Sequence, residues 1–113
     1  MHEFEKFGFV NRTALAIKPK IPFHDWLQSI EADNYGDYLK DSDVYLLPDY
    51  DDIKQMEVWL KKNFDLIFSE QLNQWYVDDS LWPQKRTFKM FNEWFDYWLC
   101  TMVSDTQQSQ LSK

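Results

Sequence analysis

The stretch Trp82–Met102, WPQKRTFKMFNEWFDYWLCTM, decides the fold because it concentrates aromatic side chains in one short segment. Phe88, Phe91 and Phe95 recur at the spacing of one helical face. Pro83 suits the start of that helix, since its ring fixes φ and its missing N–H is not needed in the first turn. The residues that follow alternate as in a strand. Because aromatic side chains bury more area than most, we expect this helix–strand unit to anchor the core.

Upstream, residues 9–18 alternate in a pattern that indicates a central strand. Leu15 and Ile17 lie on one face, and Ala14 and Ala16 lie on the other. Apolar residues on both faces are typical of a strand covered on both sides. We therefore expect the small alanines to lie beneath a closely packed helix.

Two further helices are expected from apolar stripes at helical spacing. Residues 22–30 predict a short helix, and a longer stripe runs through residues 53–75. Asp49 is the candidate N-cap of the long helix, with Asp51 and Asp52 in its first turn. Since such a helix is long for a small domain, we expect a kink or break near Asn63.

Together these elements predict an α+β fold in two layers. A small mixed three-stranded sheet (about 9–18, 44–47 and 97–104) carries three or four helices. The 113 residues fit a single domain. We assign this α+β domain to residues 1–105 and expect residues 106–113 to form a disordered tail.

The charge is negative and unevenly distributed. The net charge is −7, and the segment from Glu31 to Asp52 has eight acids and one base. This acidity argues against nucleic-acid binding, which requires phosphate neutralisation. A single cysteine, an N-terminus without a signal-peptide pattern and short apolar runs predict a cytoplasmic protein with no membrane segment.

Known catalytic and cofactor motifs are missing from the sequence. Two glycines cannot build a phosphate-binding loop or a dinucleotide fingerprint, and one cysteine with two histidines excludes the usual structural zinc sets. The Asp41–Asp43 and Asp49–Asp51 pairs resemble the start of a calcium loop but lack its glycine and glutamate. We therefore expect no cofactor, no metal and no catalytic residue, and we lean against an enzyme.

Both arginines of the chain are candidate binding residues. Arg86 lies with Lys85 and Lys89 near the predicted start of an aromatic helix, where an anion could bind. Such a basic trio is more often a solvated helix face. Alternatively, Arg12 or Arg86 pairs with a carboxylate across the sheet.

Two segments resemble those of a family of small, uncharacterised bacterial proteins. They are NRTALAIKPKIPFHDW at Asn11–Trp26 and WPQKRTFKMFNEWFD at Trp82–Asp96. The resemblance implies a stand-alone domain of unknown function, without a transferable activity, cofactor or catalytic residue. It makes Arg12, Trp82 and Arg86 the first positions to inspect.

Two functional hypotheses follow. The first is an acidic protein-interaction module, such as an adaptor, a regulatory protein or an immunity-like protein, without catalytic activity. Its partner would be a basic protein, and its interaction face would consist of Asp41, Asp43, Asp49, Asp51 and Asp52. The alternative is a small-ligand or anion-binding protein, or an enzyme, with a pocket near Arg12, Trp82 and Arg86. A homodimer through a sheet edge is a further possibility.

Overall fold

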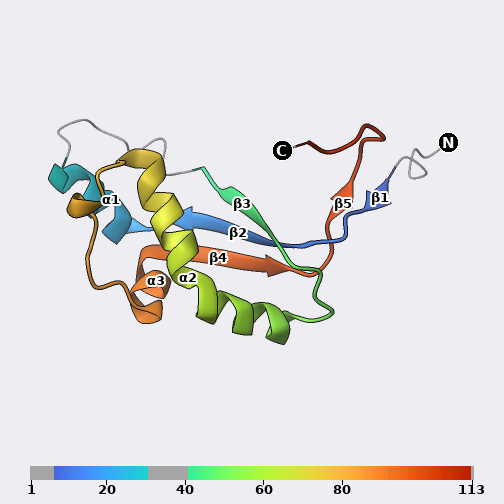
Figure 1. Cartoon of the computed structure of the whole chain (residues 1–113), viewed down its shortest axis with the longest axis horizontal. Coiled ribbons are helices and arrows are strands. Elements are labelled where there is room, and N and C mark those ends of the chain that lie inside the picture. The colour runs from blue at the N-terminus through green and yellow to red at the C-terminus, as the bar shows by residue number, and fades with distance from the viewer. Residues whose placement is uncertain (1–6, 31–40, 113) are drawn as a thin grey trace.

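The computed structural model describes residues 7–30 and 41–112, which form an α+β structure with helices packed on a small sheet (Figure 1). The main sheet has the strand order β3-β2-β4, and a two-stranded ribbon joins β1 to β5. The strands are β1 (Gly8–Phe9), β2 (Thr13–Pro19), β3 (Asp43–Leu47), β4 (Phe95–Cys100) and β5 (Ser104–Asp105). The helices are α1 (Ile21–Ile30), α2 (Ile53–Trp75), the 3₁₀ turn η3 (Asp79–Leu81) and α3 (Phe88–Trp94).

The predicted fold class is confirmed, but the expected mixed sheet is wrong in its strand directions. Both neighbours of β2 run antiparallel to it. Ile17, near the end of β2, pairs with Asp43 at the start of β3. The chain therefore leaves the sheet at the end of β2 and re-enters it at the same end to form β3. Helix α1 is thus part of an antiparallel connection and not of a crossover between parallel strands.

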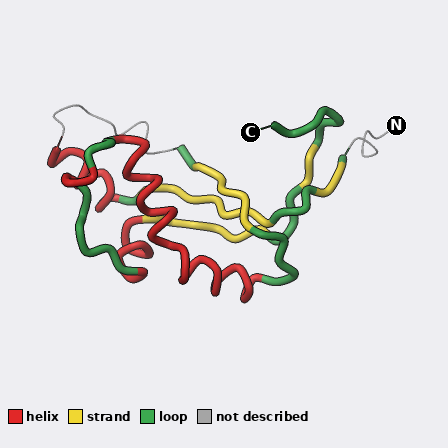
Figure 2. Tube along the Cα trace, in the orientation of Figure 1, coloured by secondary structure: helices red, strands yellow, loops and turns green. Residues whose placement is uncertain are grey.

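The predicted core anchor is confirmed in the helix–strand unit of α3 and β4. Phe91 is fully buried, and its ring contacts the rings of Phe68 and Phe95 at centroid distances of 6.1 and 5.2 Å. Phe68 crosses Phe95 at 88°, an edge-to-face contact. One aromatic cluster thus joins α2, α3 and β4, which are neighbours in Figure 2.

Three predicted helix boundaries need correction. The aromatic helix begins at Phe88 and not at Pro83, because the Thr87 hydroxyl accepts from Met90 N–H and caps that end. The N-cap of α2 is Asp52 and not Asp49. Of the kink or break expected near Asn63, the break is wrong because α2 is one continuous helix; its axis does bend along its length (Figure 1).

The expectation of a helix over the alanines is also wrong. Leu15 and Ile17 are fully buried in the core, on the face of β2 that the helices cover. On the opposite face Ala14 and Ala16 have exposed side chains beside them, including Trp98. In the described part of the chain no helix packs over this second face.

The strands expected over residues 9–18 and 97–104 are both interrupted at a bulge, which separates β1 from β2 and β4 from β5. Val10 N–H donates to Val103 O at 2.8 Å, and Ala14 pairs with Cys100. Between these two pairs, the N-terminal strand has three residues (11–13) and the C-terminal strand has two (101–102). The extra residue therefore lies on the N-terminal strand. An extra residue on one strand bends an antiparallel pair. The β1–β5 ribbon consequently leaves the sheet as an arm (Figure 1).

Candidate functional site

Arg86 is held inside the protein's own contacts. Its Nε donates to Asp65 Oδ1 at 2.7 Å and a terminal nitrogen donates to Asp65 Oδ2 at 3.2 Å. Another nitrogen donates to Pro83 O at 2.7 Å, and the side chain is 16% exposed. This fork pins the loop before α3 to α2. Arg86 therefore has a structural role: it forms an ion pair, as the alternative expected, but its partner Asp65 lies on α2 and not across the sheet.

Trp82 belongs to the same structural unit. Its Nε1 donates to Tyr76 O at 2.8 Å, and the guanidinium carbon of Arg86 lies 5.9 Å from its ring centroid. That distance is within the range of a cation–π interaction. The ring and the guanidinium thus stabilise each other and do not line a pocket around a free cation.

Arg12 lies far from these two residues. It precedes β2, whose seven residues span about 23 Å. Trp82 lies beyond the other end of β2, beside α1, where Trp26 Nε1 donates to Leu81 O. Arg12 is exposed and lines an open depression of about 790 Å³ beside the arm. The structure does not bring Arg12, Trp82 and Arg86 into one pocket.

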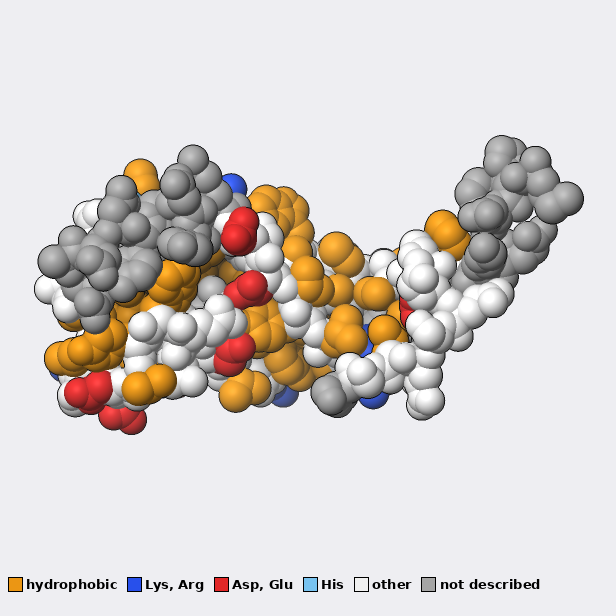
Figure 3. Space-filling model, turned by 90° about the horizontal axis from the view of Figure 1, so that it is seen from above, with side chains coloured by type: hydrophobic (Ala, Val, Ile, Leu, Met, Phe, Trp, Pro, Cys, Tyr) orange, Lys and Arg blue, Asp and Glu red, His pale blue; other side chains and the backbone are white. Residues whose placement is uncertain are grey.

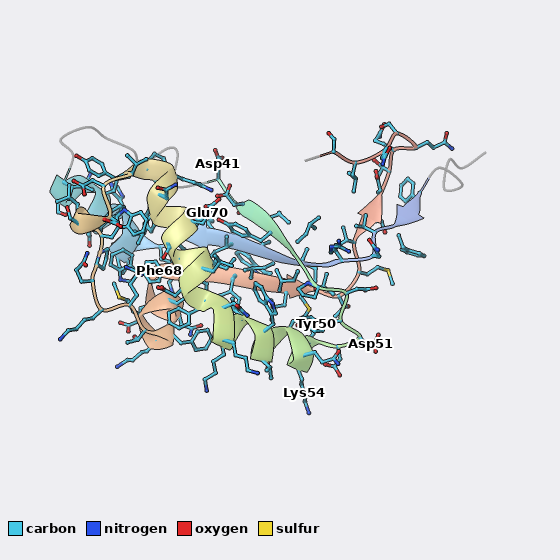
Figure 4. The ribbon with its side chains drawn as sticks, in the orientation of Figure 1. Asp41, Tyr50, Asp51, Lys54, Phe68 and Glu70 are labelled. Atoms are coloured by element: carbon cyan, nitrogen blue, oxygen red, sulfur yellow. The ribbon has the colours of Figure 1, made fainter. Side chains whose placement is uncertain are left out.

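The five predicted acidic residues lie at the two ends of β3. Figure 4 shows Asp41 at one end and Asp51 at the other. Asp43 accepts a hydrogen bond from Gln71 at 2.8 Å, and Asp52 caps α2. Asp49 is exposed near the second group. Within residues 7–30 and 41–112, no three His, Cys, Asp or Glu residues gather closely enough to hold a metal ion.

A buried polar network beside Asp43 was missed from the sequence. Gln71 is 2% exposed and donates to both Asp43 and the hydroxyl of Tyr45. The Tyr45 hydroxyl in turn lies 2.9 Å from Glu70 Oε2, to which it donates. Burial, with the nearby charge of Glu70, raises the pKa of Tyr45 well above its ordinary value. A glutamine beside Leu72 on an otherwise apolar stripe was the available signal.

A surface hollow with a volume of about 380 Å³ lies along α2. Tyr50 and Trp59 contribute apolar side chains to its lining, and Lys54, labelled with Tyr50 in Figure 4, also lines it. Of its polar groups, Asp52 and Gln55 are joined in the helix cap and Asn63 donates to Trp59 O, which leaves Lys54 and Lys62. The hollow thus offers few polar groups to orient a small molecule.

The second face of the sheet carries a continuous apolar surface. Ala16 on the central strand pairs with Val44 on one side and with Trp98 on the other, so these three residues form one row. Leu46, Ala14 and Cys100 form the next row. We call the surface of these two rows, with Lys18 and Asp96 at its end, the helix-free face. Figure 3, in which the molecule is seen from above, shows hydrophobic side chains at the surface in the middle of the molecule as well as at its helical end.

The shape of the helix-free face is uneven. The central strand contributes the small Ala14 and Ala16, whereas Val44, Leu46 and Trp98 stand on either side. Val44 is 63% and Trp98 54% exposed. The side chains of this face are therefore small along β2, and Val44, Leu46 and Trp98 on the flanking strands are larger. Periodicity showed that this face is apolar, but not that the helices leave it open.

No described helix combines the length and apolarity needed to cross a membrane. Comparison with protein-family models, curated proteins and solved structures finds no match. The resemblance to small bacterial proteins therefore stays a prediction.

Proposed function

We propose that this protein is a non-catalytic interaction module that binds a folded protein through the helix-free face. One observation carries the proposal: the solvent-facing side of an antiparallel sheet normally bears polar residues, but here it bears Val44, Leu46 and Trp98. Contiguous exposed apolar surface is typical of interaction sites. A broad, shallow surface of this kind suits another protein surface better than a small ligand.

The positions of the other candidate residues favour this function over the ligand-binding alternative. Arg86 is occupied by Asp65, and Arg12 lies at the other end of β2. The acids remain candidates for contacting a basic protein, as the charge pattern suggested. A partner that reached both acidic groups would have to span β3, about 17 Å long.

Site-specific photo-crosslinking tests the proposal in the native cell. A photo-reactive phenylalanine analogue replaces Val44 on the helix-free face, and a control protein carries it at Leu66 on the outer side of α2. Both side chains are about two-thirds exposed, at 63% and 66%. We expect a discrete protein adduct from position 44 and none from position 66. No adduct from position 44, or equal adducts from both, would contradict the proposed function.

A further inference from the structure

We infer that the partner on the helix-free face is a second copy of this chain, packed sheet to sheet about a two-fold axis. This inference rests on the proposed function and names its partner. A two-fold interface requires a surface that is complementary to itself. Two pairs of residues that lie opposite each other on β2 and β4 meet this requirement: Ala16 with Trp98, and Lys18 with Asp96.

The first pair is complementary in size. Ala16 lies opposite Trp98 in the antiparallel register of β2 and β4. If a two-fold axis runs parallel to the strands, midway between β2 and β4, it places β4 of each copy over β2 of the other. Each Trp98 then lies over Ala16 of the other copy, and Val44 lies beside it in the same row. Both copies bury a large exposed aromatic side chain, which is the type of residue that dominates interface energies.

The second pair is complementary in charge. Lys18 lies opposite Asp96, at the end of the same two strands. The same axis places Lys18 of each copy over Asp96 of the other, which gives two ion pairs related by symmetry. Lys20 Nζ lies 3.9 Å from Asp96 within the chain and adds positive charge at this end. The size match of Ala16 with Trp98 and the charge match of Lys18 with Asp96 therefore both require the two-fold axis to lie between β2 and β4.

This arrangement also accommodates the net charge of −7 on each chain. With the axis between β2 and β4, β3 lies on the outer flank of each copy. The acids at the two ends of β3 are thus directed to opposite flanks of the dimer, where solvent screens their repulsion. Packed sheets lie about 10 Å apart and cross at about 30°, so the closest contacts concentrate in the central rows.

The test exploits the reciprocity of the charge pair. In a Lys18→Glu dimer the introduced carboxylate of each copy meets Asp96 of the other, and in an Asp96→Lys dimer the introduced ammonium group meets Lys18. Facing like charges across an interface is strongly unfavourable, so sedimentation equilibrium should show each variant dimerising about tenfold or more weakly than the wild type. An equimolar mixture of the two variants places opposite charges at both contacts. We expect it to form heterodimers with close to wild-type affinity.

Matched variants on α2 separate this contact from general charge effects. Lys61→Glu and Glu57→Lys make the same charge changes at exposed positions of α2 and should leave dimerisation unchanged. Trp98→Ala should weaken it without a charge change. Circular dichroism verifies that each variant is folded, and the mixing experiment itself requires folded chains.

Three results would overturn the inference. They are a wild-type protein that stays monomeric at its highest attainable concentration, a dimer insensitive to Lys18→Glu, and a mixture that does not recover. A dimer insensitive to Lys18→Glu would point to pairing through a sheet edge. A monomeric wild type with adducts to a different protein at position 44 would overturn self-association but preserve the interaction function. Adducts between two copies of this chain at position 44, together with recovery of dimerisation in the mixture of Lys18→Glu and Asp96→Lys, would support both the interaction function and self-association.

Discussion

Gln71 and Tyr45 form a hydrogen bond of 2.7 Å between α2 and β3, at the border of the hydrophobic core. The second amide hydrogen of Gln71 goes to Asp43, and the Tyr45 hydroxyl donates to Glu70. Because the glutamine is buried, both of its N–H donors need partners within the protein. The network therefore ties the edge strand β3 to the helix that covers the sheet.

Tyr45→Phe should destabilise the fold without removing its apolar contacts. The change leaves one N–H of the buried Gln71 amide unpaired, and an unsatisfied buried donor costs about 1–3 kcal/mol. Urea unfolding should therefore show a free energy of unfolding lower by about that amount. Tyr50→Phe removes a hydroxyl outside this network and serves as the control. Equal effects of the two substitutions would contradict the role of the network.

Alkaline pH should weaken the fold through the same tyrosine. Burial, followed by the hydrogen bond to Glu70 and its charge, raises the pKa of Tyr45; burial and then the charge of Glu57 raise that of Tyr97. A group with a raised pKa in the folded state contributes stability fully below its unfolded pKa, near 10 for tyrosine, and loses it as the pH rises further.

The urea midpoint should therefore fall as the pH increases above about 10. Tyr45→Phe should make this fall less steep, although the variant is less stable at neutral pH. Absorbance of tyrosinate during the titration provides a second measurement. A wild type and a variant with the same alkaline slope would show that Tyr45 ionisation is not linked to unfolding.

Arg86→Lys should loosen the loop before α3. A lysine ammonium cannot reproduce the fork to Asp65, the bond to Pro83 O and the stacking over Trp82 together. Because Asp65 is half-exposed, we expect a loss of only about 1 kcal/mol in unfolding free energy. Limited proteolysis after Lys85 should become faster. Lys85→Met, a charge loss at an exposed neighbouring position, should not reproduce the loss of stability.

The core was predictable from the sequence because its signal is local. The spacing of Phe88, Phe91 and Phe95 specifies which side chains share a helical face, and the structure places Phe91 at the centre of the aromatic cluster. Likewise, alternation along β2 put Leu15 and Ile17 on one face, and both are buried. A periodic pattern indicates which residues lie on the same face of a helix or strand.

The candidate site was not predictable because periodicity does not record what covers a face. Ala14 and Ala16 would have the same spacing beneath a helix or on a face that no helix covers. The opposition of Ala16 to Trp98 depends on strand register between segments more than 80 positions apart, which no local pattern encodes. The acidic segment was visible in the sequence, but β3 divides it between two ends of the sheet.

The cap of α2 shows a signal that the sequence did contain. Gln55 follows Asp52 by three positions, the spacing of a capping box. Asp52 Oδ1 accepts from Gln55 N–H at 2.9 Å, and the Gln55 side chain accepts from Asp51 N–H at 2.9 Å. These two hydrogen bonds, which join Gln55 to Asp52 and to Asp51, determine which aspartate begins the helix.

Asp52→Ala and Asp49→Ala should therefore differ in stability although they remove the same charge. Loss of an N-cap costs about 1 kcal/mol, whereas an exposed substitution outside such a feature stays within about 0.5 kcal/mol. Urea unfolding at neutral pH measures both. Because Asp49 and Asp52 lie on the outer flank in the proposed dimer, neither change should weaken association of the folded chain. A larger loss of stability for Asp49→Ala would place the helix start where the charge pattern alone had put it.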